Sequence, residues 1–307
     1  MSISSLINQM LTLLIFLIVG VVAYKTKVID ENGNKVFTKV TLNIFQPAMI
    51  LSAVMRTDLA YSAGQLAGML LSTVAAYVIM IGAAYLFAPL FVRKKADRGV
   101  FRFLLCFGNV GFMGFSVIAS LFDDSAVFLA AIFNITFNLL AYSLGVYMIA
   151  EGQEGIKIDI KTLITPAFVS TVLALVIFLT QIRVPDIIYK ACDSIGDMIV
   201  PSSMIIVGVS LAGRSLKSFF ADWRIYVMSV IRLFVMPCLV FFICRLFVRD
   251  ELLLGVMTVL AAMPAAVVSS LLSIQYGRDE AIAGRGVSVT TLLSVVTVPL
   301  VVYLLLL

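Results

Sequence analysis

The stretch FGNVGFMGFSV, residues 107–117, decides the fold, because it combines residues that a simple membrane-spanning helix avoids. It lies inside an apolar run over residues 101–122, which is long enough to cross a bilayer. Glycine weakens a helix by about 1 kcal/mol relative to alanine, and an asparagine in hydrocarbon needs a hydrogen-bond partner that lipid does not offer. The run therefore predicts either a tightly packed helix or an interrupted one.

The composition places this stretch in a polytopic membrane protein. Of the 307 residues, 62% are hydrophobic and 13% are charged, and the mean hydropathy is +1.12. Soluble domains have about 45–50% apolar and 25% charged residues. We therefore expect an all-α fold of ten transmembrane helices, one in each of ten apolar stretches: 6–24, 38–55, 64–92, 100–122, 125–149, 163–182, 187–212, 224–247, 252–275 and 284–306.

The net charge of +5 is explained by membrane topology and requires no nucleic-acid partner. With the amino terminus outside, 16 basic residues fall on cytoplasmic connections: Lys25, Lys27, Lys35, Lys39, Arg93, Lys94, Lys95, Arg98, Arg102, Lys157, Lys161, Arg214, Lys217, Arg224, Arg278 and Arg285. Five fall on the opposite side: Arg56, Arg183, Lys190, Arg245 and Arg249. The positive-inside rule predicts an integral protein of the cytoplasmic membrane, in contact with lipid and with both termini extracytoplasmic.

Enzyme chemistry is not expected. The chain has no histidine, and its four cysteines show no metal-ligand spacing, so we predict no metal site and no cofactor. Membrane proteases and prenyl-transfer enzymes need acidic pairs, histidines or a metal at membrane depth, and the corresponding motifs are absent from the sequence. The first span has no basic segment ahead of it and no cleavage site, so we read it as retained.

Proline positions indicate an internal repeat. NIFQP at 43–47 and DMIVP at 197–201 each place a polar residue four positions before a proline, and Pro47 and Pro201 are 154 positions apart. Shifted back by the same interval, Pro264 falls on Val110, inside the glycine-rich stretch. Five spans per repeat require the second repeat to be inverted. We predict repeats over 1–154 and 155–307 whose interrupted fourth and ninth helices cross; a chance match of two landmarks is the alternative.

A family resemblance rests on the same stretch. GNVGFMGFSVI resembles the GNxGFxGxP-type signature of the auxin efflux carrier family, whose bacterial members are often labelled malate or malonate permeases. LLIFLIVGVVAYKTKVID and LNIFQPAMILSAV are similar to that family's first two spans. Ser116 stands where many members have proline, so the interruption would rest on glycines alone.

The resemblance implies a fold shared with bile-acid sodium symporters. Spans 1, 2, 6 and 7 would form a scaffold, and spans 3–5 and 8–10 would form a mobile transport domain. The substrate would bind at the crossing of spans 4 and 9. The resemblance also implies a homodimer.

The predicted substrate site lies at this crossing. Asn109 would hydrogen-bond a substrate carboxylate beside the positive ends of the half-helices, or else join two helices. Polar residues of the fifth and tenth spans and those after Pro264 would line the pathway, or else bond within and between helices. The site residues are Gly108, Asn109, Gly111, Gly114, Ser116, Met263, Pro264, Ala265, Asn134 and Asn138, and the further polar residues are Ser269, Ser270, Ser273, Ser288, Thr290 and Thr291.

Two charged residues have either a coupling or a structural role. Asp197 is the acid expected nearest membrane depth, where burial would let it carry a proton; an interfacial position is the alternative. Its counterparts by repeat are Asn43, Gln46 and Pro47, and Pro201 follows it. Arg232 lies within the eighth span, where a lone cation must find water, a carboxylate or a backbone carbonyl. It would attract anions or pair with an acid such as Asp197.

The sequence therefore favours a secondary transporter for a small organic anion, a carboxylate such as a dicarboxylate or an auxin-like acid. Substrate class rests mainly on the family resemblance, and the expected mechanism is an elevator-type shift of the transport domain. Coupling to H⁺ or Na⁺ is open. The alternative is an anion channel or a uniporter without ion coupling, although no repeated filter sequence or charged ring is visible.

Overall fold

The computed structural model describes residues 3–55, 62–150, 164–180, 182–213 and 222–307. This part of the chain is helical, and its isolated β-bridge joins Gly108 to Ala265. Helices lie in each of the ten apolar stretches. Of the basic residues counted for topology, Arg56, Lys157, Lys161, Arg214 and Lys217 lie outside the described residues, as does the predicted repeat boundary at 154.

Five helical stretches within the described residues are long and apolar enough to cross a membrane. They are Gly64–Phe91, Asp124–Ile149, Asp186–Ala212, Trp223–Cys244 and Glu280–Leu306. Shorter apolar helices occupy Leu11–Lys25, Pro166–Thr180 and Glu251–Ala261. The all-helical, polytopic class expected from the composition agrees with this pattern.

The chain divides into two compact units. Unit 1 comprises the described residues within Met1–Leu71, Gly111–Ile135 and Ile164–Arg214. Its helices are α1 (Ile3–Lys25), α2 (Glu31–Val40), η1 (Thr41–Phe45), α3 (Gln46–Met55), α6 (Phe115–Leu121), α9 (Pro166–Thr180), α10 (Asp186–Gly196) and α11 (Ile199–Ala212). It also holds most of η2 (Val110–Gly114) and the first part of α7 (Asp124–Leu140).

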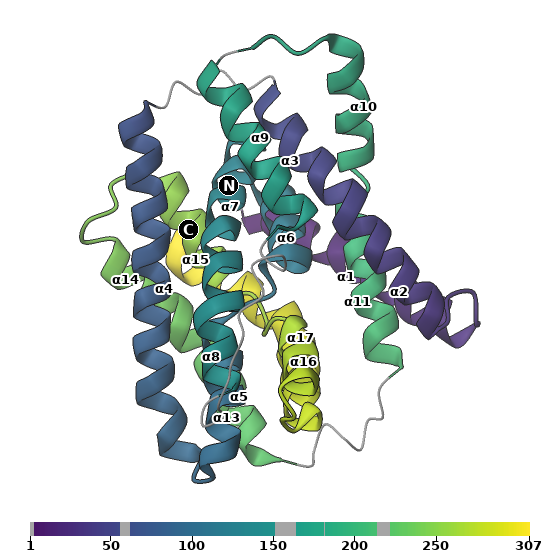
Figure 1. The fold of residues 1–307 in the computed structure, drawn as a ribbon. Helices are drawn as coiled ribbons and strands as arrows, with labels where there is room; N and C mark the ends of the chain where they lie inside the picture. Colours follow the sequence, from purple (N-terminus) through teal and green to yellow (C-terminus); the bar gives the residue numbers. More distant parts are fainter. Residues whose placement is uncertain (1–2, 56–61, 151–163, 181, 214–221) are drawn as a thin grey trace. The chain divides into compact units, whose positions relative to one another are not determined.

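In unit 1, glycines allow helices α1 and α11 to pack with their backbones in contact (Figure 1). A Cβ atom added at Gly20 would lie 2.1 Å from the carbonyl oxygen of Ile205, and one at Gly208 would lie 2.0 Å from that of Leu17. Close approach of this kind is how small residues stabilise helix pairs in membranes, where the hydrophobic effect does not separate protein from lipid. The pair α1–α11 is therefore a tight structural contact.

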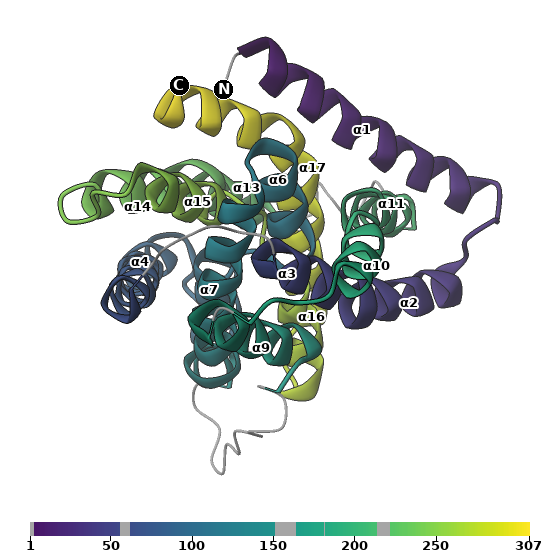
Figure 2. The ribbon, with the colours of Figure 1, turned by 90° about the horizontal axis from the view of Figure 1, so that it is seen from above.

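Unit 2 comprises the described residues within Ser72–Val110, Thr136–Leu163 and Ser215–Leu307. It holds most of α4 (Ala63–Phe91), then α5 (Lys95–Cys106), η3 (Ala141–Gly145), α8 (Val146–Ile149), α13 (Trp223–Val230), η5 (Ile231–Val235), α14 (Met236–Cys244), α15 (Glu251–Ala261), α16 (Val268–Gln275) and α17 (Glu280–Leu306). Helix α14 packs on α15, and α17 packs on α13 and α16 (Figure 2).

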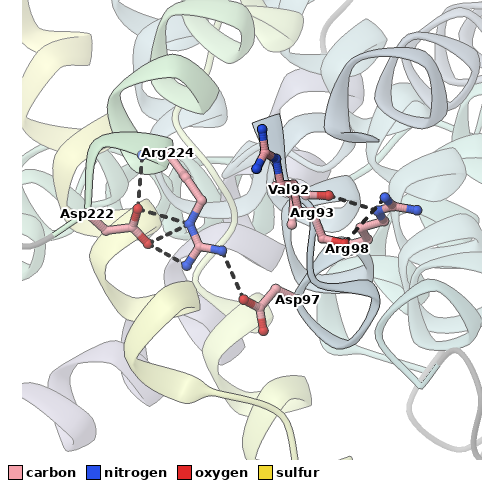
Figure 3. A network of polar contacts seen from close by, with 6 residues as sticks. All are labelled: Val92, Arg93, Asp97, Arg98, Asp222 and Arg224. Atoms are coloured by element: carbon pink, nitrogen blue, oxygen red, sulfur yellow. Dashed lines mark hydrogen bonds and ion pairs between the residues drawn. The ribbon is translucent and has the colours of Figure 1, made fainter. Parts of the chain in front are cut away.

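A polar network joins α5 to the start of α13 (Figure 3). Asp222 is the N-cap of α13; its carboxylate accepts hydrogen bonds from the backbone N–H of Arg224, at 3.0 Å, and from the Arg224 guanidinium. The same guanidinium donates to Asp97 on α5, with an N–O distance of 3.0 Å. Nearby, Arg98 donates to the carbonyl of Val92. The network fixes two helix starts to each other.

We expect Asp222 to make the stability of the protein depend on pH. Burial raises the pKa of this carboxyl, but the hydrogen bonds and charge of Arg224 lower it more, so its pKa lies below the ordinary value. A depressed pKa gives stabilisation that is present above the unfolded-state pKa and is lost as pH falls through the folded-state pKa. Asp222→Ala should therefore lower stability by about 1–2 kcal/mol at neutral pH, and by less in acid.

Thermal unfolding of the wild type and of Asp222→Ala at pH 7 and at about pH 3 checks this expectation. Asp279→Ala, which removes the N-cap of α17, controls for the loss of a helix cap alone. A difference in stability between wild type and Asp222→Ala that stays constant over this pH range would contradict the expectation.

Candidate functional site

The two interrupted helices of unit 2 pair with each other. Helix α5 ends at Cys106, and Phe107 is extended, with φ −100° and ψ 114°. The Asn109 N–H donates to the carbonyl of Pro264 at 2.7 Å, and the Ala266 N–H donates to the carbonyl of Phe107 at 3.0 Å. Backbone groups that leave a helix inside a membrane need such partners. The interruptions expected from the glycine-rich stretch and from Pro264 are thus both present. Backbone groups that one interruption leaves without a helical partner form hydrogen bonds with the other.

The position of the first interruption differs in detail from the expectation. Of the three glycines, Gly108 lies in the non-helical segment, whereas Gly111 and Gly114 lie in the π-helical turn η2 that follows it. Ser116, at the family's proline position, lies in α6. The unwound segment is therefore confined to residues 107–109, and the later glycines do not extend it.

Arg232 organises the carboxyl ends of both interrupted helices. Its Nε–H donates to the carbonyl of Met263 at 3.1 Å, and Nη1 donates to the carbonyls of Leu105 and Cys106 at 3.0 and 3.1 Å. The side chain is buried, with 1% of its surface exposed. Helix carboxyl ends carry partial negative charge that a cation stabilises. Among the alternatives for Arg232, backbone carbonyls are therefore its partners, and within the described residues it forms no ion pair.

Gly108 makes room for the Arg232 side chain. A Cβ atom at this position would lie 2.0 Å from Nη2 of Arg232 and 3.3 Å from the carbonyl oxygen of Met263. Contacts below 3.0 Å do not occur for real Cβ atoms, so a side chain here would displace the guanidinium. Glycine is needed at 108 for space, in addition to any need for an unwound backbone.

Thr290 of α17 supports the second interruption. Its hydroxyl accepts a hydrogen bond from the Ala265 N–H at 3.0 Å and donates to the carbonyl of Gly286 at 2.7 Å. Thr290 is fully buried, so no water replaces this acceptor. The sequence leaves two roles open for Thr290, a polar wall around the substrate or a bond between helices, and the structure shows its hydroxyl bonded to the backbone of residues 265 and 286.

We expect Thr290→Val to destabilise the protein by about 1–3 kcal/mol, because it leaves the buried Ala265 N–H without an acceptor. Thr290→Ser retains the hydroxyl and should keep most of the stability. Ser288→Ala is the matched control on the same helix, because the Ser288 hydroxyl donates only to Gly284 of its own helix. Equal melting temperatures for Thr290→Val and Ser288→Ala would show that the Ala265 contact is unimportant.

Aromatic packing fixes Phe107, the first non-helical residue. Its ring lies 5.8 Å from that of Tyr77, 4.6 Å from that of Phe103 and 6.1 Å from that of Phe137. All four rings belong to unit 2, and all are buried. An anchored side chain at 107 explains why the helix ends here.

The structure brings together Gly108, Asn109, Met263, Pro264 and Ala265, all of which are buried in unit 2. Gly111, Gly114, Ser116 and Asn134 belong to unit 1, where the Ser116 hydroxyl contacts the Ser203 hydroxyl. Asn134 and Asn138 are one turn apart on α7, both buried and both engaged in polar interactions.

Three serines on α16 carry buried hydroxyl oxygens without a hydrogen-bond partner: Ser269, Ser270 and Ser273. Their spacing places them on one face of the helix, directly after the second interruption. The sequence had named these residues as pathway-lining candidates or as serines bonded to their own helix. The structure shows no hydrogen bond from these three hydroxyls to their own helix.

Apart from Arg232, which is in unit 2, the predicted coupling residues lie in unit 1. Asp197 follows α10 at a short interruption before α11, and it is exposed on the surface of the chain. Asn43, in the π-helical turn η1, is also exposed, whereas Gln46 is buried; Pro47 and Pro201 are partly exposed. Within the described residues, no group of three or more acids or cysteines is placed to hold a metal ion.

Sequence reasoning named the kinds of partner open to Arg232 and Thr290 but did not identify which backbone groups they contact. The signal for the first was present, since an arginine deep in an apolar span must meet oxygen atoms. Which oxygens it meets depends on where two distant helices end. No sequence signal separates Thr290 from its polar neighbours on the same helix.

Comparison with known proteins covers almost the whole chain. A family model described as membrane transport protein matches residues 5–302. An uncharacterised transporter of Methanocaldococcus jannaschii is 25% identical over 299 residues, which cover 94% of this chain and 96% of that protein. An uncharacterised transporter of Methanothermobacter thermautotrophicus is 24% identical, covering 95% and 96%. The uncharacterised transporter YfdV of Escherichia coli K12 is 22% identical, covering 97% and 96%.

Proposed function

The chain belongs to the membrane transport protein family, that of the auxin efflux carriers, and on this premise we propose that it is a secondary transporter for a small organic anion. As a member of this family it is an integral membrane transporter. The observation that carries the proposal is the pairing of two interrupted helices around the buried cation of Arg232. The substrate binds at this crossing, with Asn109 as a ligand.

The order of the helices supports two repeats and ten spans. Helices α1, α2–η1–α3, α4, α5–η2–α6 and α7–η3–α8 are followed by α9, α10–α11, α13–η5–α14, α15–α16 and α17. In both series the fourth member is interrupted by the segment that forms the β-bridge between Gly108 and Ala265, and in the second series a short turn also separates α10 from α11. We take the second series to be the inverted copy of the first, as in other secondary transporters.

The division into units supports an elevator mechanism. The helices predicted as the scaffold, α1, α2–η1–α3, α9 and α10–α11, all fall in unit 1. Unit 2 holds the paired interruptions, Arg232 and α13–α17, whereas α6 and the first part of α7, which belong to the predicted transport domain, fall in unit 1. In the proposed mechanism, unit 2 carries the bound anion across the cytoplasmic membrane. Both termini are extracytoplasmic in this orientation, as the distribution of basic residues favours.

Uptake into proteoliposomes tests the proposal, with labelled malate, malonate and an indole carboxylate as substrates. We expect saturable uptake and counterflow of at least one of these anions. The loss of one charge-assisted hydrogen bond in Asn109→Ala should lower kcat/KM about 10- to 100-fold. Asn8→Ala, at an exposed position of α1, is the control. Sodium, pH and membrane potential are varied separately to identify the driving force.

Two results would contradict parts of the proposal. Flux of an anion that does not saturate and shows no counterflow would indicate a channel. No transport of any of the three anions under any gradient would remove the assigned substrate class.

A further inference from the structure

We propose that Arg232 binds the carboxylate of the transported anion directly, through its Nη2 group. The inference rests on the function proposed above and names the charged group that selects the substrate. It follows from the hydrogen bonds that Arg232 makes, from its burial and from the charges around it.

The guanidinium uses only part of its donor capacity within the protein. An arginine side chain carries five N–H donors, one on Nε and two on each terminal nitrogen. Nε donates to Met263, and Nη1 donates to Leu105 and Cys106, with the sulfur of Met80 at 3.8 Å. Within the described residues, nothing accepts a hydrogen bond from Nη2. The Nη2 group lies against Gly108, beside Asn109.

The charge of Arg232 also lacks a carboxylate partner. Burial of a cation is costly unless an anion or several dipoles compensate it. Here three carbonyl oxygens provide the compensation, and no acid in the described residues forms an ion pair with Arg232. A substrate carboxylate at Nη2 would supply the missing anion in a site shielded from water, where charge-assisted hydrogen bonds are strong.

The surrounding dipoles favour the same sign of ligand. The carbonyls of Leu105 and Cys106 form the negative end of α5, and that of Met263 follows the end of α15. Arg232 neutralises these two ends. Helix α16 begins at Val268, so its positive end follows Pro264 by four residues and adds to the positive charge of Arg232. The crossing therefore favours an anion.

Equilibrium binding to the purified full-length protein tests the inference separately from transport. The probe is malonate, measured by scintillation proximity and by the shift of the melting temperature, with malate as a second ligand and malonamide as a neutral analogue. Arg232→Gln should weaken malonate binding about 10- to 100-fold. Arg232→Lys keeps a charge for the three carbonyls but lacks Nη2, and it should also weaken binding at least about tenfold. Malonamide should not compete in wild type.

Arg102→Gln is the matched control. Arg102 is another buried arginine of unit 2, on α5, and its guanidinium lies 4.1 Å from the ring centre of Tyr85. This variant should bind malonate as wild type does.

Wild-type affinity for malonate in either Arg232 variant would overturn the inference, and the lysine variant decides alone if the glutamine variant does not fold. Wild type that binds neither malonate nor malate would overturn it as well. Binding that depends on Arg232, without transport in liposomes, would support the inference and contradict only the proposed function. Transport of an anion whose affinity is unchanged in the Arg232 variants would support the proposed function and contradict the inference.

Discussion

Gly108→Ala is expected to abolish transport, although the substitution adds a single methyl group. The new Cβ would occupy a position 2.0 Å from Nη2 of Arg232 and 3.3 Å from the Met263 carbonyl oxygen. Three hydrogen bonds to backbone carbonyls hold the guanidinium in place, so moving it away breaks contacts worth about 1.5–3 kcal/mol each. The interrupted helices would lose the group that joins their carboxyl ends.

Uptake and thermal unfolding of Gly108→Ala should both be measured, because we expect transport to be lost while most of the protein remains folded. We expect kcat/KM for the transported anion to fall at least about 100-fold, and the melting temperature to fall by several degrees. Gly82→Ala is the control within unit 2, since a Cβ atom there would meet no atom within 4 Å. Retention of wild-type uptake by Gly108→Ala would show that Arg232 moves freely, contrary to the structure.

The second large effect is expected at the contact between α1 and α11. A Cβ atom at Gly208 would lie 2.0 Å from the carbonyl oxygen of Leu17 and 3.0 Å from the backbone nitrogen of Val21. These are backbone atoms, so the clash is relieved only if the helices separate. Overpacking of this kind costs about 1–3 kcal/mol or more. Gly208→Ala should therefore lower the melting temperature strongly and reduce the amount of folded protein in the membrane.

A double-mutant cycle identifies this contact. Gly20→Ala produces the equivalent clash with Ile205 on the same pair of helices. Once one substitution has separated the helices, the second should add little, so the combined loss should be clearly smaller than the sum. Gly68→Ala, which meets no atom within 4 Å, controls for the loss of a glycine in a helix. Full additivity of the two substitutions would contradict a shared contact.

The helical class and the two interruptions could be predicted from sequence because each has a local cause. Apolar length predicts helices in a membrane protein. Pro264 removes a backbone donor, and Gly108 with Asn109 disfavours a continuous helix. The family assignment followed from the same residues and is confirmed by the match over residues 5–302. The role of the crossing in substrate binding stays a prediction.

The features that could not be predicted all depend on distant parts of the chain meeting. Arg232 was recognisable as unusual, but its partners are carbonyls whose availability is created by the interruptions themselves. The glycines at 20 and 208 looked like ordinary residues of apolar helices, because their need arises only from the facing backbone. Gly111 and Gly114 gave a misleading signal, since π-helical geometry accommodates them without unwinding.

The pairing of the interruptions has a consequence for biosynthesis. When the ribosome has made residues 107–109, the segment 264–266 that completes their hydrogen bonds does not yet exist, and neither does Arg232. Until then, the Asn109 N–H and the Phe107 carbonyl of the nascent chain lack their hydrogen-bond partners. Water, lipid headgroups or the translocation machinery must contact them in the meantime. Because each interruption depends on the other for its backbone hydrogen bonds, we expect a gene split between the two segments to give a working protein only if both products are made together.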